Sequence, residues 1–168
     1  LVRRQFPNAN PLHRLGRGTS GVVLFARTSE ASARVSQGWG GGRILKVYRA
    51  LASGSPVFDE FDIDTPIGPI PHPILQTIHA ASPKGKRAHS HVKVIERREE
   101  CSLIEVRITT GRPHQIRIHM AAAGHPLVGD PLYGMGGIPA ENSRALPGDL
   151  GYHLHSMLLG FPHPMTNQ

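Results

Sequence analysis

The sequence predicts an α+β fold, in which a mixed, mostly antiparallel sheet carries a few flanking helices. Residues 102–108 alternate apolar and polar side chains and follow a strand-like segment at 91–97, which is typical of an antiparallel hairpin. Directly afterwards, residues 113–124 show apolar side chains at helical spacing. The chain has 168 residues without repeats or a linker, so we expect a single domain over 1–168.

The first expected elements are a strand and a helix. Residues 22–27 form a short apolar run that we expect to be a buried strand. Thr28 and Ser29 are residue types that cap helix N-termini, so a helix is expected over about 30–37. The glycine-rich segment 38–42 should end that helix.

A second strand and a long irregular segment should follow. Residues 43–52 are expected to form a strand that carries Lys46 and Tyr48 on one face, because side chains two apart point the same way. Residues 53–90 are rich in proline and glycine and are expected to be mostly loop.

The clearest predicted helix lies after the hairpin. Pro113 suits the first helical position, and Gly124 suits the residue past the end. Ile116, Met120 and Ala123 fall on one face and should be buried. The helix start gathers donors suited to a phosphate or a base edge, although a solvated basic helix end is the alternative. These donors are Arg112, His114, Gln115 and Arg117.

The rest of the chain is less regular. Residues 124–137 contain repeated turn residues, and residues 134–151 are expected to form a long flexible loop. A short last element is expected over 154–161.

The composition points to a polyanionic partner. Lys and Arg total 19 against 12 Asp and Glu, which gives a net charge of +7 and a pI of about 10.3. Such a surface attracts nucleic acid, although a merely basic protein has the same balance. The longest clean apolar run, 22–26, is far too short to cross a membrane, and the first residues carry no signal-peptide pattern. The single cysteine, Cys101, excludes an internal disulfide and favours a reducing, intracellular compartment.

Other chemical motifs are weak. Gly16, Gly18 and Gly21 form a G-x-G-x-x-G string, but it precedes a strand-like run instead of opening a helix, so a tight loop is the better interpretation. The 11 histidines suggest a metal site, yet no pair of them has a carboxylate or thiolate nearby to complete a ligand set. Neither Ser20 nor Cys101 has the sequence context of a nucleophile.

Three segments, in the right order, resemble RluA-type RNA pseudouridine synthases. The first is HRLGRGTSGVVLFAR at residues 13–27, and the second is KVYRALASG at residues 46–54. The third is TGRPHQIRIHMAAAGHPLVGDPLYG at residues 110–134, which is long and very specific. Shorter matches extend the resemblance over nearly the whole chain, at 64–68, 86–88, 154–156 and 161–164.

This resemblance implies the pseudouridine synthase fold and an enzyme that isomerises uridine in RNA, such as rRNA or tRNA, with no metal, cofactor or membrane. Such an enzyme cuts the N-glycosidic bond of a flipped-out uridine, turns the uracil and rejoins it through carbon. By the same resemblance, Tyr48 would stack on the uracil, Arg14 would guide or replace the flipped base, and Arg117 would pair with the catalytic carboxylate. Further residues would contact RNA or line the same pocket: His13, Arg17, Arg112, His114 and Gln115.

Two departures from the family pattern matter. The family has its catalytic aspartate directly after His-Arg-Leu, where this chain has Gly16, and Gly18 replaces a residue that is usually acidic or polar. Glycine cannot act as a base or nucleophile, and Arg117 would lose its partner. The family also carries strands before this motif, whereas only twelve residues precede His13, so we expect the N-terminal strands to be missing and a sheet edge to be exposed.

Three functions stay open from the sequence. The chain is a working pseudouridine synthase in which another carboxylate replaces the missing one, a catalytically silent RNA-binding relative, or an inactive fragment. In the first case, restoring aspartate at position 16 should change turnover little. The candidate replacements lie in a stretch that we expect to be flexible: Asp59, Glu60, Asp62 and Asp64.

Overall fold

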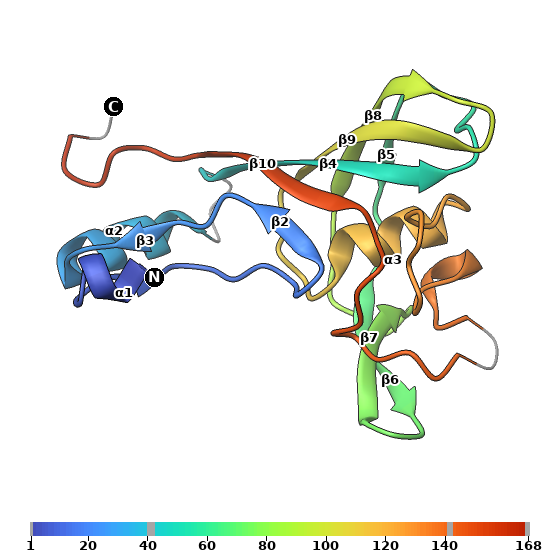
Figure 1. Ribbon diagram of the computed structural model, residues 1–168, viewed down its shortest axis with the longest axis horizontal. Helices are drawn as coiled ribbons and strands as arrows, with labels where there is room; N and C mark the ends of the chain where they lie inside the picture. Colours follow the sequence, from blue (N-terminus) through green and yellow to red (C-terminus); the bar gives the residue numbers. More distant parts are fainter. Residues whose placement is uncertain (1, 40–42, 141–142, 167–168) are drawn as a thin grey trace.

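A six-stranded sheet dominates the computed structural model, which describes residues 2–39, 43–140 and 143–166 (Figure 1). The strand order is β2-β10-β4-β9-β8-β5. Neighbours β2 and β10 are parallel, and every other neighbouring pair is antiparallel, so the expected mixed, mostly antiparallel sheet is confirmed. The strands are β2 (Thr19–Gly21), β4 (Leu45–Ser53), β5 (Glu60–Ile63), β8 (Ser90–Arg97), β9 (Cys101–Ile108) and β10 (Leu154–Gly160).

Two small sheets and a few helices surround this sheet. β1 (Asn10–Pro11) pairs with β3 (Phe25–Ala26), and β6 (Ile67–His72) pairs with β7 (Gln76–Ala81). In Figure 1, α3 lies between the sheet and the β6–β7 hairpin, whereas α2 lies with β3 away from α3. The helices are α1 (Val2–Gln5), α2 (Ser29–Trp39), α3 (Gln115–Ala122) and the 3-10 turn η1 (Met135–Gly137).

The core forms where α3 packs on β4, β8 and β9. The alternation predicted for β9 is confirmed, because the even-numbered residues of 102–108 are buried and the odd-numbered ones are not. Ile116 and Met120 of α3 belong to the same apolar cluster. A second cluster joins Ile118 of α3 to Ile67 of the β6–β7 hairpin. Apolar contacts on both sides therefore fix α3, and with it the residues at its N-terminus.

The predicted strands around this core are largely confirmed. Residues 43–52 correspond to β4, residues 91–97 and 102–108 to the β8–β9 hairpin, and residues 154–161 to β10. Between η1 and β10, the described residues contain no further helix or strand, as expected for a loop over 134–151.

The first predicted helix is present as α2. Its cap is confirmed, because the Thr28 hydroxyl accepts the backbone N–H of Ala31 at 3.1 Å. The helix runs past the expected end at residue 37 and includes Gly38 and Trp39. Residues 40–42 of the expected breaker lie outside the described residues.

The second predicted helix, α3, begins at Gln115. The expected place of Pro113 as first helical residue is wrong, because His114 adopts a left-handed conformation with a φ of 55° and interrupts the helical geometry. The expected burial of Ile116 and Met120 is confirmed, whereas Ala123 is only partly buried.

The single buried strand expected over 22–27 is wrong. β2 ends at Gly21, whose φ of +111° favours glycine. β2 lies before the run and joins the main sheet, whereas only Phe25 and Ala26 of the run form a strand, β3, which pairs with β1. Val22 between them is 42% exposed.

The expectation that 53–90 is mostly loop overlooked three strands, because β5, β6 and β7 lie within this segment. The high proline content of this segment was the reason for predicting a loop. Pro69 and Pro71 both lie in β6, opposite His79 and Thr77 of β7. β6 belongs to a two-stranded sheet and has an open side, where a residue without a backbone N–H is tolerated.

Candidate functional site

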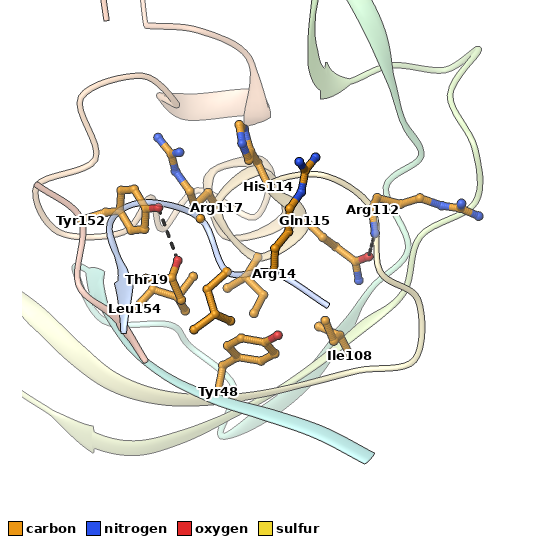
Figure 2. A pocket seen from close by; sticks show the side chains of 13 residues that line it. Arg14, Thr19, Tyr48, Ile108, Arg112, His114, Gln115, Arg117, Tyr152 and Leu154 are labelled. Carbon is orange, nitrogen blue, oxygen red and sulfur yellow. Dashed lines mark hydrogen bonds between the residues drawn. The ribbon is translucent and has the colours of Figure 1, made fainter. Parts of the chain in front are cut away.

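Two connected hollows lie where the start of α3 meets β4 and the segment before β2 (Figure 2). The inner pocket has a volume of about 110 Å³, and the outer cleft has about 710 Å³. Every site residue predicted from the sequence lines at least one of them. His13 and Arg17 line only the outer cleft, and Gln115 and Arg117 line only the inner pocket. The residues that line both are Arg14, Leu15, Gly16, Tyr48, Ile108, Arg112 and His114.

Tyr48 forms the floor of the inner pocket (Figure 2). It lies on the central strand β4, in register with Ser156 of β10 and Val106 of β9. Burial raises the pKa of the Tyr48 phenol, so the ring stays neutral near pH 7. Lys46 and Tyr48 both line the outer cleft, which confirms that they share one face of β4.

The guanidinium of Arg117 is buried and paired. Its Nε donates to Asp130 Oδ2 at 2.6 Å, its Nη2 donates to Oδ1 at 2.7 Å, and its Nη1 donates to the Pro147 carbonyl at 3.0 Å. Its central carbon lies 4.9 Å from the ring centre of Tyr133 and 4.1 Å from that of Tyr152. Burial alone would lower the pKa of Arg117, but the hydrogen bond and charge of Asp130 outweigh it and raise the pKa. The expectation that Arg117 lacks a partner is wrong, because Asp130 supplies the carboxylate.

His114 has an unusual backbone conformation at the start of α3. Its φ of 55° lies in the left-handed region, which non-glycine residues seldom adopt outside functional sites. The Tyr133 hydroxyl donates to the His79 carbonyl at 2.7 Å, so it accepts from His114 Nδ1, also at 2.7 Å. Burial, followed by the charge of Arg117, lowers the pKa of His114 to about 4. The imidazole is therefore neutral at pH 7, with its proton on Nδ1.

Gln115 and Arg112 are engaged in holding the turn before α3. The Gln115 side-chain oxygen accepts from the Thr110 hydroxyl at 2.8 Å and from the Arg112 backbone N–H at 3.0 Å. Its amide nitrogen donates to the His89 carbonyl at 2.8 Å. The Arg112 side chain extends away from Tyr48 (Figure 2), and its Nε donates to a backbone carbonyl at 3.0 Å. The amide of Gln115 thus has protein partners and positions the helix start, and its contact with RNA stays a prediction.

Positively charged side chains line the two hollows. Among the residues that the structure describes, no Asp or Glu contributes to either lining. Lys46 is only 6% exposed, and burial lowers its pKa. A positive field without counter-charges suits a phosphate backbone. The cations in the outer cleft are Arg14, Arg17, Lys46 and Arg112.

Tyr152 lines the inner pocket beside Gly16 and was missed by the sequence analysis. A Cβ at Gly16 would lie 2.8 Å from the Tyr152 hydroxyl oxygen, and a Cβ at Gly18 would lie 2.9 Å from the Tyr152 ring. The same hydroxyl lies 3.3 Å from the Thr19 hydroxyl (Figure 2). Tyr152 therefore occupies the space next to both glycines that interrupt the family motif. No spacing in the sequence links residue 152 to them, because only the pairing of β10 with β2 brings them together.

The acidic residues expected to replace a missing carboxylate lie elsewhere. β5 forms the edge of the sheet opposite β2, so the expectation of a flexible stretch is wrong there. Asp59 pairs with Arg97 at 2.7 Å, and Glu60 pairs with Lys93 at 2.8 Å. Asp62 Oδ1 lies 3.1 and 3.0 Å from the rings of two neighbouring histidines. None of the four candidates lines either hollow in the described structure.

The weaker motifs are not part of this site. The last three residues of the G-x-G-x-x-G string form β2, and the string does not open a helix. The Ser20 hydroxyl lies 2.8 Å from His155 Nδ1, but both side chains are exposed and outside the two hollows. In the described parts of the chain, no three metal-ligand side chains gather as they would around an ion. No helix within those parts is both long and apolar enough to cross a membrane.

The chain is similar in sequence to known pseudouridine synthases. It is 44% identical to RNA pseudouridine synthase 5 of Arabidopsis thaliana, over 95% of this chain and 54% of that protein. It is 45% identical to an uncharacterised RNA pseudouridine synthase of Synechocystis, over 99% of this chain and 58% of that protein. It is 39% identical to ribosomal large subunit pseudouridine synthase D of Neisseria meningitidis, over 98% and 44% respectively. The chain thus spans about half the length of the curated relatives that it matches.

Two solved human structures have the same fold. One is RNA Pseudouridylate Synthase Domain Containing 1, with a TM-score of 0.75 and 26% identity over 96% of this chain and 67% of that one. The other is RNA Pseudouridylate Synthase Domain Containing 4, with a TM-score of 0.72 and 20% identity over 92% and 67%. In addition, the family model described as RNA pseudouridylate synthase matches residues 3–122. The chain therefore belongs to the RluA-type family of RNA pseudouridine synthases.

Proposed function

We propose that this chain acts on RNA as a pseudouridine synthase and that its inner pocket receives the uracil of a uridine that has left the base stack. One observation carries the proposal: Tyr48 and Arg117, which come from different elements, line the same pocket beneath a cationic cleft. An aromatic floor accepts a planar base, and the cations around it attract the phosphates on either side.

Base flipping costs a few kcal/mol, which contacts in the cleft must offset. Arg14 is exposed and lines both hollows, and its side chain lies between Tyr48 and His114 in Figure 2. A guanidinium at this place can stack in the gap that the base leaves or hold a neighbouring phosphate.

The proposed reaction is an isomerisation and needs no second substrate. The bond from C1′ to N1 breaks, the uracil turns on the face of Tyr48, and a bond from C1′ to C5 forms. C5 then loses its proton, and N1 gains one, so atoms and charge balance. Arg117 does not touch the base in this scheme, because its donors are held by Asp130 and Pro147. Its role is to position the wall of the pocket.

RNA binding without isomerisation is the second candidate function, and one observation favours it. In the described structure, the pocket lining contains no carboxylate that could act on the sugar or take the C5 proton. The Tyr152 hydroxyl oxygen lies 2.8 Å from where a Cβ at position 16 would be.

The two candidates are separated by mapping pseudouridine in total RNA after incubation with the purified chain. Pseudouridine formation by the unchanged chain excludes the silent candidate. RNA binding without product supports it. A folded chain that neither binds RNA nor forms pseudouridine contradicts both candidate functions. The interpretation as an inactive fragment then remains.

Variants at position 16 test whether the rest of the pocket is competent. Gly16→Asp alone should give little gain, because its Cβ would lie 2.8 Å from the Tyr152 hydroxyl oxygen. No other Tyr152 atom lies within 4 Å of that Cβ, so Gly16→Asp combined with Tyr152→Phe should accommodate the carboxylate and raise pseudouridine formation. Tyr152→Phe alone is the matched control. If neither the double variant nor this control forms pseudouridine, the pocket does not support the reaction.

A further inference from the structure

Trp39 and His13 form an aromatic ledge in the wall of the outer cleft, next to the site described above. Trp39 is the last residue of α2, and His13 lies in the segment before β2. Their ring centres are 5.1 Å apart, and the planes are tilted by 36°. Both line the same cleft as Tyr48, which is also the floor of the inner pocket. The ledge is therefore a second aromatic surface within the cleft.

The His13 ring is held in its neutral form. Its Nε2 accepts the backbone N–H of Leu24 at 3.0 Å, so this nitrogen carries no proton. Burial, together with the nearby charge of Lys46, lowers the pKa of His13. The two rings of the ledge are thus uncharged at neutral pH, so the ledge offers aromatic faces on which a base can stack.

Lys46 supplies a cation beside this ledge. Its Nζ lies 5.9 Å from the ring centre of Trp39. Lys46 is largely buried but lines the cleft, and a Cβ at Gly111 would lie 3.8 Å from this Nζ, in ordinary van der Waals contact. Among the described residues, no carboxylate lies within ion-pair distance of Lys46. The position combines a π face with an uncompensated charge, which is the combination that binds an unpaired nucleotide.

We propose that Trp39 and His13 form a second nucleotide subsite, in which a base adjacent to the uridine stacks on Trp39 while Lys46 binds a phosphate. This inference rests on the proposed function, because it assumes that the inner pocket holds the uridine. It adds a specific requirement: at least one neighbour of the target uridine is unstacked as well. The preferred substrate is then a loop or single strand and not a uridine inside a continuous duplex.

The only tryptophan of the chain is Trp39, so intrinsic fluorescence reports this subsite directly. The probe is a hairpin RNA with an all-uridine loop, labelled at one end so that anisotropy measures binding independently. The comparison RNA is the same hairpin with one loop uridine intact and abasic sites at the other loop positions. Both hairpins should bind, and only the first should quench Trp39 emission.

Trp39→Leu tests the contribution to affinity, with Trp39→Phe as the variant that keeps a stacking ring. Leucine should weaken binding of the all-uridine hairpin by roughly 5- to 100-fold, and phenylalanine should restore part of the loss. Neither variant should change binding of the abasic hairpin by a comparable factor. This contrast separates lost stacking from a general disturbance of the fold.

Three outcomes would overturn the subsite. Binding with unchanged Trp39 emission, or equal quenching by both hairpins, refutes stacking while RNA binding by the chain stands. Equal losses for both hairpins in Trp39→Leu refute it as well. Absence of binding by anisotropy contradicts the proposed function itself, so the two failures are distinguishable.

Discussion

At the scale of single residues, the ion pair of Arg117 and Asp130 determines how the pocket wall is built. Both side chains are almost fully buried, at 2% and 1% exposure. Asp130 Oδ1 also accepts the backbone N–H groups of Leu132 and Tyr133, at 2.9 and 3.1 Å. The pair thus connects α3 to the turn that follows it. A buried charge that loses its partner is costly, since water cannot replace the lost contact.

Arg117→Met should therefore destabilise the protein by about 3–5 kcal/mol, because Asp130 would stay buried without a partner. Urea unfolding measures the loss. The matched control is Arg34→Met, which removes an exposed ion pair to Glu30 with side chains 49% and 58% exposed. It should cost less than about 1 kcal/mol. Equal losses of unfolding free energy in the two variants would show that the buried ion pair stabilises the protein no more than the exposed one.

The sequence predicted which residues line this site better than it predicted which side chains those residues contact. The motifs around Tyr48 and Arg117 are contiguous, so both could be assigned to the pocket by resemblance. The partner of Arg117 could not be assigned in this way. Asp130 lies 13 residues from Arg117, and the spacing of residues in the sequence does not reveal the geometry of the turn that contains Asp130. Tyr152 was missed for the same reason, since its contact with Thr19 spans 133 residues.

At the scale of elements, the β6–β7 hairpin is the largest difference from expectation. Local composition indicated loop, yet tertiary contacts impose strands. Ile67 exchanges two backbone hydrogen bonds with Lys86, at 3.0 and 2.8 Å, which brings Gly85 against β6. A Cβ at Gly85 would lie 2.4 Å from the Ile67 carbonyl carbon and 2.7 Å from the Gly68 nitrogen. Only glycine fits there, and this long-range requirement is not visible in a local pattern.

Gly85→Ala should thus destabilise the fold by at least about 1–3 kcal/mol, because backbone atoms on β6 cannot move aside cheaply. Gly38→Ala in α2 is the matched control. Its Cβ would meet only side chains, at 3.6 Å or more, and alanine favours helix over glycine by about 0.5–1 kcal/mol. Thermal or urea unfolding should move in opposite directions for the two variants. A neutral Gly85→Ala would mean that the hairpin is not held as described.

At the scale of the whole molecule, the charge distribution matters more than any one contact. The chain carries a net charge of +7, and the hollows collect cations while Asp59 and Glu60 are paired on the far edge of the sheet. The sequence shows the sign of the net charge, and the class of partner stays a prediction. It could not predict this separation, which depends on the strand order.

RNA affinity should fall steeply with salt, because bound phosphates release counterions. Arg14→Gln should reduce the slope of log affinity against log salt by about 0.7 if it removes one phosphate contact on a single strand. Arg34→Gln, which removes a charge paired with Glu30 outside the two hollows, should leave the slope unchanged. Anisotropy with the labelled hairpin over a potassium chloride series measures both. Identical slopes for the two variants would place the RNA elsewhere.

The position of β10 has a consequence for how the molecule is made. This strand is the last along the described chain, yet it inserts between β2 and β4. While translation is still in progress, β4 can pair with β9 and β9 with β8, but β2 lacks the strand with which it pairs. The edge of β4 that later pairs with β10 is then unpaired, and an unpaired strand edge favours aggregation. Completion of the sheet and completion of the candidate pocket therefore both require β10, so a ribosome that stalls before residue 154 leaves a chain without that pocket.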